Sequence, residues 1–106
     1  LFTVFSFTIT YTVAVISGTS SLHLILKKII LAKGVTVLVS DMTFIGGVSP
    51  ILYEGGMPVF IDSEYQDGNI SPNLLLQYLE SNRDNLPKAL IVVHLYGMPC
   101  EILRIR

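Results

Sequence analysis

The hydrophobic pattern of the chain changes its period several times, and each change marks the border of a predicted element. Residues 11–16 are rich in β-branched residues and continue a period-two alternation, which is typical of a strand. From residue 20 to residue 32, apolar side chains recur every three or four positions, which predicts a helix that Gly34 is placed to end. Residues 35–39 are a short, continuous β-branched run, as expected for a strand buried on both faces.

The same rhythm continues in the second half of the chain. Residues 44–53 are predicted to form a helix, weakened by Pro50 inside it, and residues 58–61 a third strand. Ser71, followed by a proline, has the chemistry of a helix cap, and residues 88–93 are predicted to form the last strand. This alternation predicts an α/β fold of three layers, with a mostly parallel sheet covered by helices on both faces.

Composition limits the chain to one domain or to part of one. It has 106 residues, of which 51% are hydrophobic and 14% are charged, whereas the usual charged share is about 25%. A chain this short exposes much of its surface, so the scarcity of charge predicts that neighbouring structure covers some of it. We therefore expect residues 1–106 to form a single, partial domain.

Charge and cysteine content argue against several classes of function. A net charge of −1 without basic clusters does not suit nucleic-acid binding. Cys100 is the only cysteine, so no disulfide framework exists and a reducing compartment, the cytoplasm, is expected. Residues 1–26 carry no charged side chain and are long enough to cross a bilayer, but the polar residues at 17–21 and His23 interrupt them, so no membrane segment is expected.

The sequence SGTSS at residues 17–21 joins the first predicted strand to the first predicted helix. Backbone N–H groups at the start of a helix, together with the helix dipole, favour an anion and above all a phosphate group. Gly18 lets the backbone come close to such a ligand. Hydroxyl donors follow it at Thr19, Ser20 and Ser21. The alternative is that these residues only cap the helix, and the stretch matches neither the Walker A pattern nor the dinucleotide fingerprint.

Three further residues follow predicted strands, at the edge where open α/β sheets bind ligands. Phe44 either offers a flat face to a planar cofactor or belongs to the core. For His94, a structural hydrogen bond to a neighbouring loop is favoured over a catalytic role. Asp62 either points to the same edge or caps the loop that follows it. No metal site is expected, because no carboxylate, cysteine or second histidine stands at metal-ligand spacing from His94.

Four stretches together resemble the DegT/DnrJ/StrS family of pyridoxal-phosphate-dependent sugar aminotransferases. They are AVISGTSSLHLIL, SDMTFIGGVSPILYEGGMPVFID, GNISP and PKALIVVHLYGMP, and the similarity extends from about Tyr11 to about Pro99. The family's consensus motifs are close to SGT-x-A-L-H-L, S-x-T-F, A-x-P-V-F-x-D and V-H-L-Y-G. Several motifs at the right spacing are far more specific than any one of them. The second and fourth stretches look most similar to enzymes that aminate UDP-4-keto-6-deoxy sugars.

The resemblance implies a fold, a cofactor and a set of binding residues. The chain would be part of the large domain of a fold-type-I enzyme that uses pyridoxal 5′-phosphate. Gly18, Thr19 and Ser20 would hold the cofactor phosphate, and Phe44 would stack on the pyridine ring. Ser21 stands where the family commonly has alanine. The family also implies a nucleotide-sugar substrate, glutamate as the amino donor, and a homodimer with its active site at the subunit interface.

The same resemblance predicts what these residues lack. The family's Schiff-base lysine comes later in the chain, as does the aspartate that pairs with the pyridine nitrogen, and neither motif occurs here. No catalytic residue is therefore expected within the 106 residues, and the chain alone is expected to be inactive. Residues 1–10 and 100–106 depart from the family pattern, so a truncated or frame-disrupted gene product is expected. An intact reading frame through both ends would contradict this expectation.

The hypothesis that follows is a fragment of a nucleotide-sugar aminotransferase. The parent enzyme would transfer an amino group from glutamate to a keto-sugar nucleotide, a UDP-4-keto-6-deoxy-hexose, for surface glycan biosynthesis. The alternative hypothesis is a catalytically inactive remnant, or a non-enzymatic α/β binding module, that retains a phosphate-binding turn.

Overall fold

The computed structural model describes residues 13–106, and helices and strands alternate along them. The longest helix has 12 residues, and no helix in the described part reaches the length and apolar character that a membrane span requires. The elements, in chain order, are α1 (Gly18–Ile29), β1 (Thr36–Ser40), the 3₁₀ turn η1 (Ile45–Gly47), α2 (Ser49–Tyr53), β2 (Met57–Ile61), α3 (Pro72–Ser81), β3 (Ala89–Ile91), the 3₁₀ turn η2 (Leu95–Gly97) and α4 (Ile102–Ile105).

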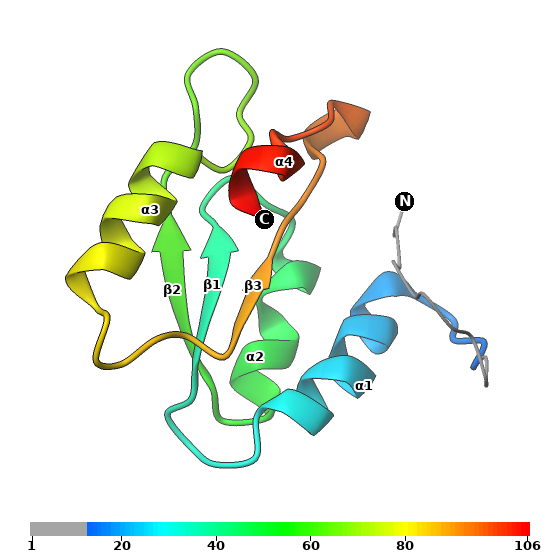
Figure 1. Cartoon of the computed structure of the whole chain (residues 1–106). Helices are drawn as coiled ribbons and strands as arrows, with labels where there is room; N and C mark the ends of the chain where they lie inside the picture. Colours follow the sequence, from blue (N-terminus) through cyan, green and yellow to red (C-terminus); the bar gives the residue numbers. More distant parts are fainter. Residues whose placement is uncertain (1–12) are drawn as a thin grey trace.

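The strands form one parallel sheet in the order β2-β1-β3 (Figure 1). Leu38, in the middle of the central strand β1, pairs with Val59 of β2 on one side and with Leu90 of β3 on the other. Because the strands are parallel, their carboxyl ends meet at one edge of the sheet. The segments that follow β1, β2 and β3 are therefore brought to the same end of the molecule.

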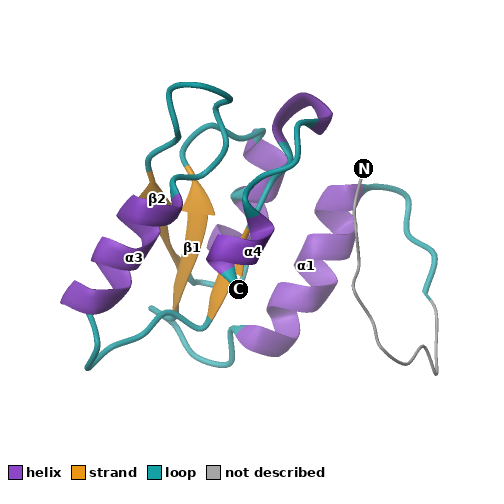
Figure 2. Ribbon diagram, turned by 45° about the horizontal axis from the view of Figure 1, so that its top comes forward, coloured by secondary structure: helices purple, strands orange, loops and turns teal. Residues whose placement is uncertain are grey.

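Helices cover both faces of the sheet, which confirms the expected α/β fold class. Figures 1 and 2 show α3 and α4 on one side of the sheet and α1 and α2 on the other. The neighbours Val37 and Leu38 are both fully buried, and they belong to different core clusters because side chains alternate across a strand. The first cluster joins Val37 to Leu26, Ile30 and Ile51, and the second joins Leu38 to Ile61, Ile70 and Leu75.

The strand predicted at residues 11–16 is wrong in the part that the structure describes. Residues 11–12 lie outside the described residues, and residues 13–16 have no strand structure. The side chains of Val13 and Ile16 are 73% and 99% exposed. A strand needs a neighbouring strand to pair with its backbone N–H and C=O groups, and no strand of the described sheet pairs with this segment.

The helix predicted at residues 44–53 is divided into η1 and α2. Pro50 explains the division, because proline lacks an N–H group and is accepted only in the first turn of a helix, where it lies in α2. The last strand is also shorter than the predicted range of residues 88–93.

The predicted helix cap at Ser71 is confirmed. Its hydroxyl accepts the N–H of Leu74 at the start of α3, and Pro72 is the first helical residue. This element could be predicted because its cap, its proline and its apolar stripe are all close together in the sequence.

Candidate functional site

A cavity of about 450 Å³ lies between α1, the segment after β1, and β3. Its volume is in the range that binds small molecules, about 300–1,000 Å³. Leu22 and Ile25 of α1 and residues 89–93 form apolar walls, and Thr19, Phe44 and His94 also line it. No acidic side chain of the described residues lines the cavity, so its walls do not repel an anion.

Thr19 and Phe44 approach each other at Gly46. A Cβ atom placed on Gly46 would overlap Oγ1 of Thr19 and would lie only 2.9 Å from Cε1 of Phe44. No larger residue fits at this position unless one of these two side chains moves. Glycine therefore allows the first turn of α1 to pack directly against the loop after β1, with the hydroxyl and the aromatic ring both close to the position that a Cβ would take.

The start of α1 combines a cap with backbone donors that no described residue accepts from. Ser17 caps the helix: its hydroxyl accepts the N–H of Ser20 at 3.2 Å, and its carbonyl accepts the N–H of Ser21 at 3.1 Å. The N–H groups of Gly18 and Thr19 have no acceptor among the residues that the structure describes. The first turn carries no acidic residue, and the helix dipole adds partial positive charge. These features favour an anion at this helix start.

The predicted site residues do not all reach the cavity. Thr19 and Phe44 line it, together with Ser21, whereas Gly18 and Ser20 lie on the same turn but outside the lining. The hydroxyl of Ser20 is 2.9 Å from that of the capping serine. The side chain of Phe44 is 78% exposed, so the interpretation that places it in the core is wrong and the ring is accessible to a ligand. The binding roles of these residues remain predictions.

His94 has the structural hydrogen bond that the sequence suggested. Its Nδ1 accepts the backbone N–H of Cys100 at 3.1 Å, so in the neutral ring the proton lies on Nε2. Asp62 caps the loop that follows it, because its Oδ1 accepts the N–H of Ser63 at 2.7 Å. Its side chain does not line the cavity. Of the two alternatives for Asp62, the structure favours the loop cap.

Sequence reasoning missed two residues that shape the site. No role at the site is predicted for Gly46 from the sequence, although a glycine two residues after the aromatic of a motif can signal a close approach. Asn69 is only 2% exposed, and its side chain joins two loops: Oδ1 accepts the N–H of Leu95 at 3.0 Å, and Nδ2 donates to the carbonyl of Met98 at 3.1 Å. Asn69 thus holds the loop that carries His94.

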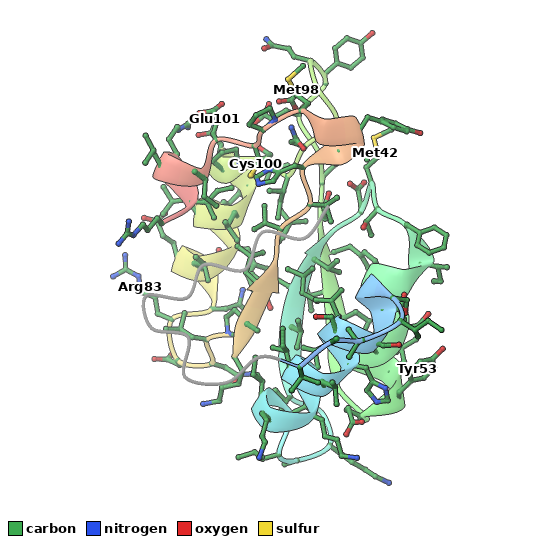
Figure 3. The ribbon with its side chains drawn as sticks, turned by 90° about the vertical axis from the view of Figure 1, so that its right-hand side faces the viewer. Met42, Tyr53, Arg83, Met98, Cys100 and Glu101 are labelled. Carbon is green, nitrogen blue, oxygen red and sulfur yellow. The ribbon has the colours of Figure 1, made fainter. Side chains whose placement is uncertain are left out.

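These loops gather at the end of the sheet where the strands finish. Figure 3 shows Met42, which follows β1, and Met98, which follows β3, at that end of the molecule. Tyr96, between His94 and Met98, has a φ of 51°, a left-handed conformation that is uncommon outside glycine.

Cys100, whose backbone N–H donates to His94, is buried. Burial raises the pKa of its thiol, and the negative charge of Asp67 adds to the rise.

Replacing Gly46 by alanine is expected to disturb the site, because the new Cβ has to displace Thr19 or Phe44. We expect the free energy of unfolding to fall by about 1–3 kcal/mol, as measured by chemical denaturation. The matched control is Gly47→Ala, whose Cβ would meet only the side chain of Thr43, at 3.3 Å. Equal effects of the two changes would contradict the close contact at Gly46.

Because the pKa of its thiol is raised, Cys100 is expected to react slowly with thiol reagents at alkaline pH. The folded chain should react several-fold more slowly with a thiol reagent than the urea-unfolded chain, and its rate profile should move to higher pH. Because the folded state favours the neutral thiol, this group's contribution to stability is complete below the usual thiol pKa and is lost as the pH rises through the raised pKa. Cys100→Ala should remove that loss, and an unchanged alkaline profile in this variant would contradict the assignment.

Sequence comparison finds relatives over most of the chain. Residues 5–106 match the DegT/DnrJ/EryC1/StrS aminotransferase family. The chain is 44% identical over 91 residues to the EpsN protein of Bacillus subtilis (strain 168), and the matched region covers 84% of this chain and 24% of that protein. It is 36% identical over 95 residues to the GDP-perosamine synthase of Escherichia coli O157:H7, and the matched region covers 90% of this chain and 25% of the synthase.

The fold comparison agrees with the sequence comparison. The crystal structure of a DegT DnrJ EryC1 StrS aminotransferase from Brucella abortus superimposes with a TM-score of 0.71 and 28% sequence identity, over 83% of this chain and 24% of that chain. The present chain spans about a quarter of the length of the curated relatives it matches. With motifs, fold and family match in agreement, the chain belongs to the DegT/DnrJ/EryC1/StrS family of sugar aminotransferases.

Proposed function

We propose that residues 1–106 form the part of a nucleotide-sugar aminotransferase that holds the cofactor, as a single, partial domain. The observation that carries the proposal is the meeting of Thr19 and Phe44 at one cavity, beside N–H groups at the start of α1 that have no acceptor among residues 13–106. When bound, pyridoxal 5′-phosphate supplies the electron sink that amino-group transfer requires. The family implies this cofactor, and the residues of the site fit it.

The fit can be argued group by group. The N–H groups of Gly18 and Thr19 and the hydroxyl of Thr19 would bind the phosphate, and the hydroxyl of Ser20, now bonded to the cap, would be a further donor. The exposed face of Phe44 would lie against the pyridine ring. The absence of a side chain at Gly46 leaves this cradle open.

The remaining walls of the cavity are mostly apolar. Leu22, Ile25 and Val92 line the cavity with apolar atoms, and a low local dielectric strengthens each hydrogen bond to an anion. His94 lines the same cavity with its proton held on Nε2, because Nδ1 is already occupied. A ligand oxygen near His94 would therefore meet a donor.

The covalent step needs an amine that this cavity does not contain. None of the chain's four lysines, at positions 27, 28, 33 and 88, lines it. In our proposal the lysine and the aspartate that pairs with the pyridine nitrogen come from other residues of the whole protein, and the 106 residues alone are inactive. The same observation keeps the alternative, a catalytically inactive remnant or a binding module, as the second candidate.

The whole protein is proposed to act in the cytoplasm as a homodimer. It would transfer an amino group from glutamate to a UDP-4-keto-6-deoxy-hexose on the way to a surface glycan. Similarity to a GDP-perosamine synthase supports a nucleotide-sugar substrate, and the two stretches after β1 and at β3 support the UDP-sugar branch.

Binding of pyridoxamine 5′-phosphate tests the cofactor site, because this form lacks the aldehyde that would react with surface lysines. Thr19→Val and Phe44→Leu should each weaken its binding about tenfold in equilibrium dialysis, through loss of a charge-assisted hydrogen bond or of ring stacking. Pyridoxamine, which has no phosphate, should bind far more weakly. The matched controls are Thr36→Val, at the opposite end of β1, and Phe60→Leu, on β2. Equal losses in the controls, or equal binding of both ligands, would contradict the site.

Turnover by the whole protein tests the substrate. With glutamate and pyridoxal 5′-phosphate, it should aminate the UDP-linked 4-keto-6-deoxy-hexose at least about tenfold more efficiently than the GDP-linked and dTDP-linked sugars, as mass spectrometry of the product would show. Preference for another nucleotide would contradict the UDP assignment alone. Cofactor binding without turnover on any keto sugar would favour the inactive remnant.

A further inference from the structure

A hydrogen bond between His23 and Glu54 lies on the same face of α1 as Thr19. Nε2 of His23 is 2.6 Å from Oε1 of Glu54, the C-cap residue directly after α2. An ionised carboxylate can only accept, so the ring N–H of His23 donates. The ring also packs edge-to-face on Tyr53, with centroids 5.5 Å apart and an interplanar angle of 63°. The side chains of His23 and Glu54 are only 40% and 20% exposed, which shields their hydrogen bond from water.

This face of α1 packs on α2 and η1, which run beside it (Figure 1). Thr19, His23, Leu26 and Ile30 recur along it at intervals of three or four residues, so they lie on one side of the helix. Leu26 and Ile30 are buried in the core cluster and hold the second half of the helix. The first half is held through Thr19, which contacts Gly46, and through the hydrogen bond of His23.

The described residues before α1, 13–16, give its first turn little support. Residues 13–16 form no strand, and the side chains of Val13 and Ile16 are exposed. Apolar contacts have no preferred direction and permit a helix to turn or slide by a small amount, whereas a hydrogen bond depends on both distance and angle. At Gly46 there is no free space, so even a small turn of α1 would move Oγ1 of Thr19 relative to the ring of Phe44.

We propose that His23 is a positioning residue for the anion site. Its hydrogen bond to Glu54 sets the rotation of the first turn of α1 and keeps the hydroxyl of Thr19 beside Gly46 and Phe44. The inference rests on the proposed function only in taking cofactor phosphate as the anion. His23 acts through the helix and is not assigned any contact with the ligand.

The test compares two substitutions of His23 in the full chain. His23→Phe removes the donor but keeps an aromatic ring against Tyr53. His23→Gln keeps an N–H donor near the position of Nε2. Lys28→Ala, on an exposed part of the same helix, is the control for general effects on α1. Two properties are measured: the NMR signals of Thr19 and Gly46 without ligand, and the dissociation constant of pyridoxamine 5′-phosphate.

His23→Phe should shift the Thr19 methyl and Gly46 amide signals and weaken binding about tenfold, the factor expected when the displaced hydroxyl of Thr19 loses its charge-assisted hydrogen bond to the phosphate. His23→Gln should restore both properties, and Lys28→Ala should change neither. A purely structural role would instead lower the unfolding temperature of His23→Phe and leave its signals and its affinity as in the wild type. That result would overturn the inference.

The partner residue gives an independent check if His23→Phe does not fold. Glu54→Met removes the acceptor while keeping the length of the side chain, and it should reproduce the shifted signals and the weaker binding. If the wild type itself fails to bind pyridoxamine 5′-phosphate, the proposed function is contradicted, and the ligand-free signals still decide whether His23 positions Thr19. Unchanged signals and unchanged binding in Glu54→Met would refute the role of the pair.

Discussion

The candidate site depends on the contact between the first turn of α1 and Gly46. A Cβ at this glycine would overlap the hydroxyl of Thr19 and come within 2.9 Å of the ring of Phe44. Because of this contact, Thr19 and Phe44, which are 25 positions apart in the sequence, line one cavity. Close packing of this kind has little tolerance, since protein interiors are about as dense as organic crystals.

The parallel sheet explains why the other components gather at this point. The strands β2, β1 and β3 end at the same edge, so the loops that carry Phe44, Asn69 and His94 are neighbours. Asn69 then joins the loop after β2 to the loop after β3 through its buried side chain. The core clusters on the two faces of the sheet keep this edge fixed, because Val37 and Leu38 are buried on opposite sides of the central strand.

Much of the fold could be predicted where the decisive residues are close together in the sequence. Ser71 and the proline after it predict α3, and the run of mostly β-branched residues at 35–39 predicts a buried strand. The site could be predicted in part: Thr19 and Phe44 line one cavity, whereas Gly18 and Ser20 lie outside its lining. That difference could not be predicted, because which side of a helix start faces a cavity depends on the packing of the whole helix.

The sequence by itself determined the alternation of strands and helices, the parallel α/β class and the membership of the family, since these depend on local propensity, periodicity and motif spacing. Tertiary structure decided the rest. Residues 13–16 are rich in β-branched side chains, but no described strand pairs with them, and they form no strand. Gly46 and the pair of His23 and Glu54 acquire their roles only when α1 lies against η1 and α2. Contacts between distant segments carry no local pattern, and they exist only once the helices are packed.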